Sequence, residues 1–550
     1  MASSFLARCT ALLVLVSSLA GCAAPSATAT PHKPRLVVFF VIDGLPQRQV
    51  TAYRDQLAPD GFARFLDRGA WFTEAHHGHA FTVTAAGHAA VLTGASPHRS
   101  GIIGNEWLDP ATGAQVYNSG DVRYRYIGNR TDPLDGTSPL HLKAETVGDV
   151  LRRLEPRSKV VAISGKDRGA ILPAGRSGTA YMYMDETGQF ASSTYYMPSH
   201  PAWVDAFNGR RPADRYFRSE WKRLLPEQAY QSSVSESEPW IASRGGRNPM
   251  PMSAPADEAP GPAFYDELRR SPFIDALALD FARAAIAGEQ LGRDDAPDIL
   301  SVSLSGHDYV NHAFSAESRL SHDHFLHLDR MLEAFFRDLD ATVGRGNYLA
   351  LLTADHGFTP APEYTLSRGG SAGHMNAGQS LARVNAELVA RFGPGRWVRG
   401  YSAATLLLNR PLLAERGLDA DTVAQAARTA LLADPAVEVA YTRRELLSGS
   451  RAGAPYFEAM RKAWHPEVSG EIQYALKPGW MWLSRRASAS HGSPYRQDTH
   501  VPILVYGPPW VKPGRVDTPV QVVDIAPTLS GLLGVPVPAS SEGKQLPLPR

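Results

Sequence analysis

Residues 36–42, Leu-Val-Val-Phe-Phe-Val-Ile, are followed directly by Asp43 and Gly44. An unbroken run of β-branched, aromatic and aliphatic residues is typical of a strand that is buried on both faces of a parallel sheet. Further along, Thr84 precedes the alanine-rich residues 85–93, which predict a short helix that ends at Gly94. An acid at the end of a strand could bind a metal ion, and a hydroxyl at the start of a helix could be the nucleophile that this ion activates.

Other stretches repeat the alternation of buried strands and amphipathic helices. Strands are predicted at 159–164, 299–304, 348–353 and 501–506, and helices at 61–68, 139–154, 274–287, 323–339 and 525–533. Strands that alternate with helices predict an α/β domain with a central, mostly parallel sheet flanked by helices. We place this catalytic domain at residues 35–540.

Two segments interrupt the alternation and predict cap insertions. Residues 169–262 are punctuated by Tyr, Ser, Pro and Gly without a sustained period, but their aromatic side chains favour an ordered segment. Residues 358–486 form the second insertion. Within it, residues 398–408, 422–432 and 437–442 predict a small β-α-β group.

The charge of the chain gives no support to two kinds of partner. The 550 residues carry a formal net charge of +1, and no long basic or acidic block occurs. Nucleic acid binding and attachment to a membrane through a polybasic patch both need clustered positive charge. We therefore expect neither.

The N-terminal residues 1–21 predict a signal peptide. Arg8 precedes an apolar core at residues 11–19, which is too short to span a membrane, and small residues follow. The segment resembles a bacterial lipoprotein signal, which implies cleavage before Cys22, a lipid on Cys22, and a location in the periplasm or cell envelope. The alternative is an ordinary signal peptide cut after a small residue. Residues 22–34 are rich in Ala, Ser, Thr and Pro and predict a flexible tether.

The exported chain would hold no internal disulfide. Cys9 lies within the signal peptide, so Cys22 would be the one cysteine of the mature protein. Core packing and bound metal would then provide the stability.

Acidic and histidine side chains follow the predicted strands where each one ends. Asp43 follows the first strand, and Asp355 and His356 follow the strand at 348–353. Ligands of open α/β folds collect at the carboxyl ends of strands, so these side chains lie where a site would form. Each one alone could equally be a turn or capping residue.

Two further stretches complete the candidate ligand set. Asp308 and His312 follow the strand at 299–304 and are four residues apart, so they share a face if this stretch is helical. His491 lies in a loop ahead of the strand at 501–506. Three Asp and three His suit two Zn²⁺ ions, which can clamp both oxygens of an in-line phosphoryl transfer.

Thr84 is the candidate nucleophile of this set. A metal ion lowers the pKa of a threonine hydroxyl, and the start of a helix adds backbone N–H groups that face a phosphate. The alternative is that Thr84 only caps the helix. Thr82 is a rival nucleophile, but Thr84 directly opens the helix.

The ordered set of motifs resembles the alkaline phosphatase superfamily, and within it the PafA type of bacterial alkaline phosphatase with a threonine nucleophile. The resemblance covers about residues 35–535 and implies an alkaline-phosphatase-like sheet with cap insertions. The motifs that carry it are Val41-Ile42-Asp43-Gly44, Thr84-Ala85-Ala86-Gly87-His88, Gly104-Asn105, Lys166-Asp167-Arg168, Asp308 with His312, Asp355-His356-Gly357 and His491-Gly492-Ser493-Pro494.

The resemblance implies a role for each candidate residue. Asp308, His312 and His491 would bind one zinc ion. Asp43, Asp355 and His356 would bind the other, which Thr84 would also touch.

The resemblance also implies the substrate class. Asn105, Lys166 and Arg168 match family residues that contact the nonbridging phosphate oxygens, and related diesterases lack this Lys and Arg pair. Two cations favour a dianionic monoester over a singly charged diester. We therefore expect a monomeric two-zinc alkaline phosphatase that hydrolyses phosphate monoesters through a covalent phosphothreonine. The alternatives are a phosphodiesterase or nucleotide pyrophosphatase of the same superfamily, and a noncatalytic surface-binding lipoprotein.

Several conspicuous polar residues are not predicted to bind metal. The histidine cluster that precedes the nucleophile has no acidic partner in sequence, and one histidine is expected to pack behind the nucleophile helix. A structural role is expected for the acid and histidine that precede the strand at 501–506. These residues are His76, His77, His79, His88, Asp498 and His500.

Overall fold

The computed structural model describes residues 33–484 and 487–549. The predicted signal peptide and residues 22–32 of the predicted tether lie outside this part of the chain. Lys33–Arg550 form one compact unit. Among the described residues, no helix combines the length and the apolar character needed to cross a membrane.

A central sheet of nine strands organises the described residues, and its core is parallel as predicted. β12, β1, β11, β6 and β7 are parallel neighbours, whereas β19 and β8 pair antiparallel on either side of them. The strands in spatial order are β20 (Gly514–Val516), β2 (Ala70–Phe72), β19 (Ile503–Tyr506), β12 (Tyr348–Thr353), β1 (Leu36–Ile42), β11 (Asp298–Leu304), β6 (Val160–Ser164), β7 (Thr179–Met184) and β8 (Gln189–Ala191).

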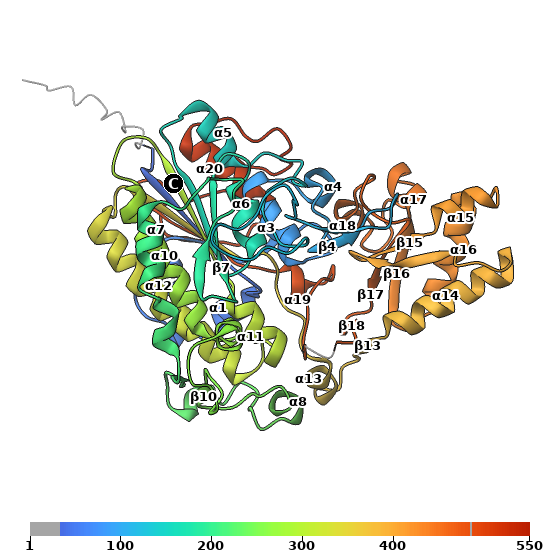
Figure 1. Ribbon diagram of the computed structural model, residues 1–550, viewed down its shortest axis with the longest axis horizontal. Helices are drawn as coiled ribbons and strands as arrows, with labels where there is room; N and C mark the ends of the chain where they lie inside the picture. The colour runs from blue at the N-terminus through green and yellow to red at the C-terminus, as the bar shows by residue number, and fades with distance from the viewer. Residues whose placement is uncertain (1–32, 485–486, 550) are drawn as a thin grey trace, which may run out of the picture. The chain divides into compact units, whose positions relative to one another are not determined.

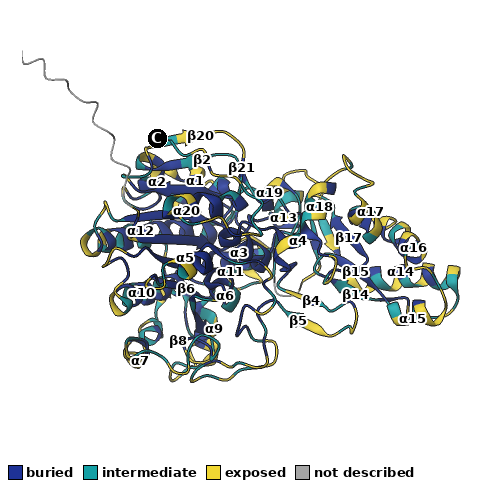
Figure 2. Cartoon of the chain, turned by 90° about the horizontal axis from the view of Figure 1, so that it is seen from above, coloured by how far each residue is buried: buried dark blue, intermediate teal, exposed yellow. Residues whose placement is uncertain are grey.

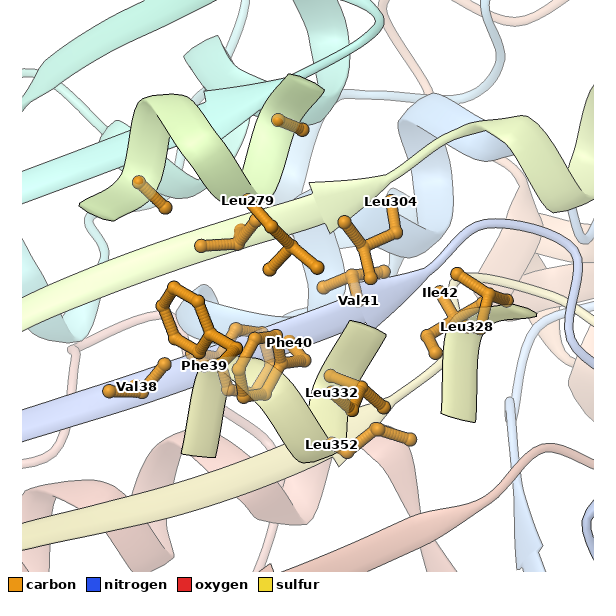
Figure 3. Packing of buried hydrophobic residues seen from close by; sticks show 14 of the residues in the cluster. Val38, Phe39, Phe40, Val41, Ile42, Leu279, Leu304, Leu328, Leu332 and Leu352 are labelled. Carbon is orange, nitrogen blue, oxygen red and sulfur yellow. The ribbon is translucent and has the colours of Figure 1, made fainter. Parts of the chain in front are cut away.

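Strand β1 lies in the middle of this sheet and is buried on both faces. It pairs in parallel with β11 from Leu36↔Asp298 and with β12 from Leu36↔Tyr348. Phe40 packs edge-on against Phe335, with ring centroids 5.7 Å apart, and its surroundings are apolar (Figure 3). Full burial of such a side chain contributes about 2 kcal/mol of stability, which explains the uninterrupted apolar sequence of β1.

Helices cover both faces of the sheet (Figure 1). The long helices α10 and α12 lie on one face, and helix α3 lies on the other with α5, α6 and α20. Their bounds are α3 (Thr84–Thr93), α5 (Val147–Leu154), α6 (Asp167–Ala174), α10 (Pro272–Glu289), α12 (Arg319–Thr342) and α20 (Ile525–Leu533). Shorter elements of the same unit are α1 (Gln47–Ala52), α2 (Phe62–Arg68), β3 (Ala75–His76), α4 (Pro97–Ser100), β4 (Glu106–Leu108), β5 (Gln115–Tyr117), α11 (Gly306–Phe314), α19 (Arg496–Thr499) and β21 (Val520–Gln521).

The first predicted insertion starts inside the central sheet. Residues 169–191 form α6, β7 and β8, which extend the sheet beyond β6. The rest of the segment holds short elements, and Trp221 and Tyr230 anchor it by donating hydrogen bonds to Asp323 of α12, at 2.7 and 2.5 Å. These elements are α7 (Ala202–Gly209), β9 (Glu220–Trp221), α8 (Pro239–Ala242), β10 (Met250–Pro251) and α9 (Pro262–Leu268).

The second predicted insertion contains a sheet and a hydrophobic core of its own, which we call the cap. Of the predicted β-α-β group, the helix at 422–432 and the strand at 437–442 are confirmed. The single strand predicted at 398–408 is wrong, because these residues form two antiparallel strands that turn at Ala403 and Ala404, both with positive φ. The cap sheet has the order β14 (Val398–Ser402), β15 (Thr405–Leu408), β17 (Ile472–Leu476) and β16 (Val437–Thr442), and every pair in it is antiparallel.

Helices and a short strand pair complete the cap. In Figure 1, the orange helices α14, α15 and α16 lie around this second sheet. The cap elements are α14 (Ala377–Phe392), α15 (Arg410–Glu415), α16 (Ala420–Leu432), α17 (Arg443–Ser448) and α18 (Phe457–Ala463), with α13 (Pro362–Ser367), β13 (Gly373–Met375) and β18 (Trp480–Trp482) in the connecting segments.

Candidate active site

Four neighbouring parallel strands bring the predicted residues to one edge of the sheet. Asp355 follows β12, Asp43 follows β1, Asp308 lies in α11 just after β11, and Lys166 follows β6. The carboxyl ends of parallel strands lie at the same edge, and ligands bind there in open α/β sheets. The sheet order β12-β1-β11-β6 therefore places these four side chains side by side.

Asp308, His312 and His491 form the first donor group. Their donor atoms all lie within 4.8 Å of one another. His312 Nε2 is 3.4 Å from Asp308 Oδ1, and His491 Nε2 is 3.6 Å from the same oxygen. Asp308 and His312 are one turn apart in α11, as predicted, and the loop after the cap brings in His491. This geometry suits one metal ion with imidazole and carboxylate ligands.

Asp43, Asp355 and His356 form the second donor group. His356 Nε2 lies 3.6 Å from Asp43 Oδ1 and 3.5 Å from Asp355 Oδ2. Asp308 adjoins this group as well, because its donor atom lies within 4.8 Å of those of Asp43 and His356. The two groups are therefore contiguous, and Asp308 stands between them.

The three histidines present the same ring nitrogen to the site. His312 Nδ1 is 3.0 Å from the carbonyl of Ala489, and His491 Nδ1 is 2.9 Å from that of Thr82. His356 Nδ1 is likewise 2.9 Å from the carbonyl of Gly357. In each pair the ring N–H donates to the carbonyl, which leaves Nε2 unprotonated, the arrangement found for metal-binding histidines. The Nε2 atoms of His312 and His491 lie 3.2 Å apart.

Burial also favours the neutral form of the imidazoles. Burial lowers the pKa of His491 well below its usual value, and the neighbouring His356 and His312 lower it further. Burial likewise lowers the pKa of His312, although the charge of Asp308 opposes the shift. Neutral imidazole is the form that binds a metal ion.

Unpaired buried atoms provide a test of whether metal ions fit these groups. The carboxylates of Asp43, Asp308 and Asp355 each hold an oxygen that is buried without a hydrogen bond, and His356 Nε2 is buried in the same way. A buried acceptor without a partner costs about 1–3 kcal/mol. Burial raises the pKa of Asp43 well above its usual value, and the charge of Asp355 adds to this. Two Zn²⁺ ions would satisfy these oxygens and nitrogens, so the donor set fits them.

Thr84 is the first residue of helix α3, which is buried along its length (Figure 2). The first turn of α3 packs against the second donor group. A Cβ at Gly87 would lie 2.0 Å from the carbonyl oxygen of Asp355, so only glycine permits this approach. His88 Nδ1 lies 3.1 Å from Asp355 Oδ2. The hydroxyl-bearing end of α3 is thereby fixed beside Asp355.

Asn105 is held against the start of the same helix. Its side-chain oxygen accepts a hydrogen bond of 2.9 Å from the backbone N–H of Ala85. The amide NH₂ group of Asn105 therefore remains available as a donor.

Lys166 is buried between the two donor groups, with 4% of its surface exposed. Its Nζ lies 2.5 Å from Asp308 Oδ2 and 2.7 Å from Asp43 Oδ2. Burial favours the neutral amine, but the charges of Asp308 and Asp43 raise the pKa of Lys166 above its usual value. The residue predicted to bind phosphate oxygens thus also contacts carboxylates of both candidate metal sites.

Tyr117 and Tyr309 are contacts of this site that the sequence did not reveal. The hydroxyl of Tyr117, at the end of β5, donates to Asp167 at 2.6 Å and accepts from Arg168 at 3.2 Å. Lys166 Nζ lies 4.7 Å from the ring centre of Tyr309. Both tyrosines line a cavity of about 320 Å³ that also exposes Lys166 and Arg168. Tyr117 therefore contacts Arg168, and Tyr309 contacts Lys166.

Asp498 and His77, which were predicted to lie outside the metal ligand set, have other hydrogen-bond partners in the structure. Asp498 accepts hydrogen bonds from Thr359, at 2.8 Å, and from the backbone N–H of Ser493, at 2.9 Å. It therefore fixes the loop that carries His491, in agreement with the expected structural role. His77 donates to the carbonyl of Ala354, at 3.0 Å.

Glu74, His76 and His500 form a third group of donor atoms within 4.8 Å of one another. Arg496 already binds both carboxylate oxygens of Glu74, at 2.7 and 2.8 Å, and holds its pKa at about 2. A guanidinium at this position disfavours a metal cation, because like charges repel.

A sheet edge with two contiguous donor groups, next to a threonine that begins a helix, defines a protein of the alkaline phosphatase superfamily. Residues 37–500 match the family described as type I phosphodiesterase / nucleotide pyrophosphatase. The chain belongs to this family and is of the PafA type.

The similar proteins cover almost the whole chain. Alkaline phosphatase PafA of Elizabethkingia meningoseptica is 33% identical over 538 residues, 97% of each chain. Alkaline phosphatase PhoV of Synechococcus elongatus is 33% identical over 98% of each chain. The crystal structure of wild-type PafA matches with a TM-score of 0.86 at 32% identity and covers 94% of this chain and 98% of that one. A form of PafA substituted at a threonine, an asparagine, a lysine and an arginine matches with a TM-score of 0.85.

Proposed function

We propose that this protein is an exported, monomeric alkaline phosphatase with two zinc ions that hydrolyses phosphate monoesters through a covalent phosphothreonine. The observation that carries the proposal is the position of Lys166, a buried ammonium group in contact with Asp308 and Asp43 of the two donor groups. A site with this cation and Arg168, in addition to metal ions, carries positive charge that suits a dianionic phosphate.

Relatives support the same substrate class. Curated relatives at 33% identity are named alkaline phosphatases. The substituted form of PafA changes a threonine, an asparagine, a lysine and an arginine, which are the residue types that occur here, in the same chain order, at Thr84, Asn105, Lys166 and Arg168.

The proposed reaction has two displacements at phosphorus. The Thr84 hydroxyl gives up its proton to solvent, and Oγ1 forms a bond to phosphorus. The bond from phosphorus to the ester oxygen breaks, and the departing oxygen takes up a proton from water to give the alcohol. A water molecule then attacks the phosphothreonine, and the Oγ1–phosphorus bond breaks to release inorganic phosphate. Thr84 is the first residue of α3, so the positive end of the helix dipole would stabilise the phosphate in both steps.

Each charged or polar side chain has one task in this scheme. Lys166, Arg168 and the amide of Asn105 donate to the nonbridging oxygens, whose charge they stabilise. Zinc ions held by Asp308, His312, His491 and by Asp43, Asp355, His356 would lower the pKa of the threonine hydroxyl and stabilise charge on the leaving oxygen.

Replacement of Lys166 by alanine tests the substrate class. We expect kcat/KM for a phosphate monoester to fall about 100-fold, since a charge-assisted hydrogen bond contributes about 1.5–3 kcal/mol. The loss for a diester with the same leaving group should be several times smaller, because the diester carries one negative charge fewer. Lys462→Ala removes a half-buried lysine outside the donor groups and is the matched control. Equal losses on both substrates would argue against a monoesterase.

A phosphodiesterase or nucleotide pyrophosphatase is the second candidate function. The family description favours it, because it names these two activities. The wild-type protein would then hydrolyse the diester faster than the monoester with the same leaving group. The paired rates therefore separate the two candidates directly.

Export and lipid anchoring through Cys22 are a separate part of the proposal. The observation behind it is the sequence of residues 1–22. Cys22→Ser should move the protein from the membrane fraction to the soluble fraction of the cell envelope, since a lipidated cysteine is the proposed anchor. Cell fractionation with immunoblotting measures this, and a variant that stays in the membrane fraction would contradict the anchor. Cys9→Ser, which leaves the predicted lipid attachment site intact, is the control.

A further inference from the structure

A small pocket lies between the cap and the catalytic unit, directly beside His491. Its volume is about 60 Å³. The cap contributes Tyr474, Trp480 and Trp482, and the catalytic unit contributes Phe81 and His491. The pocket thus joins an aromatic surface of the cap to a donor of the first metal group.

Packing holds the aromatic walls in place. The ring of Trp482 meets that of Tyr401 at a centroid distance of 5.1 Å, and that of Tyr474 at 6.0 Å. Phe81 is enclosed on the other wall, because a Cβ at Gly492 would lie 3.1 Å from its ring. Rings that are fixed by neighbours offer a flat apolar contact at a small entropic cost.

The pocket has the size of a single ring. A buried water needs about 10–15 Å³, so the pocket has room for a few water molecules, which is on the scale of one ring. Among the residues that the structure describes, Asp498 is the one acidic residue that lines it, and Thr359 and Ser493 donate hydrogen bonds to its carboxylate. No lysine or arginine lines the pocket among the described residues. The pocket therefore suits an uncharged group.

The pocket also lies on the side from which a leaving group departs. Helix α3 fixes Thr84 beside Asp355 of the second donor group, whereas His491 belongs to the first donor group. In an in-line displacement, the nucleophile and the leaving oxygen are on opposite sides of the phosphorus. The leaving group of a substrate attacked by Thr84 therefore points toward His491 and the pocket.

We propose that this pocket binds the aromatic ring of an uncharged leaving group, so that the enzyme favours aryl-type phosphate monoesters over alkyl ones. The inference rests on the proposed function, because it needs Thr84 to attack the phosphorus. Trp482 and Phe81 contact the ring as specificity-determining residues, and neither takes part in bond making.

The test compares one aryl and one alkyl monoester, phenyl phosphate and methyl phosphate. Trp482→Ala should lower kcat/KM for phenyl phosphate about fivefold to tenfold, since an aromatic pair is lost, and should leave that for methyl phosphate within about twofold. Trp482→Phe should restore most of the activity on phenyl phosphate. Leu483→Ala, which removes the next side chain, 57% exposed, should leave both rates unchanged.

The outcomes separate this inference from the proposed function. If Trp482→Ala lowers both rates equally, or lowers neither, the inferred aromatic subsite is wrong, but the proposed phosphatase function is not contradicted. A wild-type protein that hydrolyses neither monoester overturns the proposed function and the subsite together. Circular dichroism of Trp482→Ala and Trp482→Phe checks that both variants fold, and competitive inhibition by phenylphosphonate, but not by inorganic phosphate, should weaken in Trp482→Ala.

Discussion

Replacing Thr84 by alanine should lower kcat/KM for phosphate monoesters about 10⁴-fold or more. The loss is large because the covalent route through phosphothreonine needs this nucleophile, whereas most substitutions remove only a single contact. The fold should persist, because Thr84 is the first residue of α3 and the N-terminal turn keeps its contact through Gly87. Zinc content should also persist, because the six predicted Asp and His ligands remain. Single-turnover assays measure the loss of activity, and metal analysis measures the zinc content.

Two variants make the Thr84 experiment decisive. Thr84→Ser keeps a hydroxyl at the same position and should retain a substantial part of the activity. Thr82→Ala removes the rival hydroxyl, which instead donates a hydrogen bond of 3.0 Å to the carbonyl of Ser493, and should cost far less. Trapping of phosphate on Thr84 should be detectable by mass spectrometry of the quenched wild-type enzyme. If Thr82→Ala abolishes turnover and Thr84→Ala does not, the assigned nucleophile is wrong.

The central sheet could be predicted from sequence because its strands are buried on both faces. The runs at 36–42 and 348–353 coincide with β1 and β12, and the run at 299–304 with all but the first residue of β11. The candidate ligands follow these strands, so the site could be located once the ends of the strands were predicted correctly. The spatial order of the strands, which makes the two groups contiguous, depends on pairing that no local pattern contains.

The elements and contacts that were not predicted correctly depend on local capping or on contacts between distant residues. The helix predicted at 139–154 begins only at Val147, because Thr146 and Asp149 form a capping box there. Ser138, which precedes the predicted helix, donates a hydrogen bond of 2.7 Å to Asp121. Tyr117 could not be found, since its contact with Arg168 joins residues from separate elements. The apolar pattern of residues 398–408 continues through the turn between the two strands. The turn residues, Ala403-Ala404, are not typical of a turn, so the sequence did not predict it.

Lys166 connects the two candidate metal sites with the proposed phosphate site. Without metal ions, the carboxylates of Asp43 and Asp308 are buried acceptors whose nearest cation is Lys166. Metal ions at these carboxylates would compete with the ammonium group, because both are cations. The same lysine would then be free to turn toward the dianionic phosphate. In the proposed enzyme, metal binding and substrate binding would therefore be coupled through Lys166.

Removal of His312 tests the metal part of the proposal with the second large effect. His312→Ala deletes one of three donors of the first group and should reduce bound zinc from about two ions per chain to about one. Activity should fall about 10³-fold or more, since charge on the leaving oxygen then lacks several kcal/mol of stabilisation. Elemental analysis after dialysis, together with kcat/KM on a phosphate monoester, measures both effects.

His76→Ala is the matched control, because it removes a histidine from the third donor group. Arg496 already neutralises Glu74 in that group, so zinc content and activity should stay at the wild-type level. Wild-type protein that binds no zinc after preparation in zinc-containing buffer would contradict the proposed cofactor and favour a noncatalytic binding protein. An unchanged zinc content in His312→Ala would show instead that the ion does not depend on this side chain, which α11 sets 3.4 Å from Asp308.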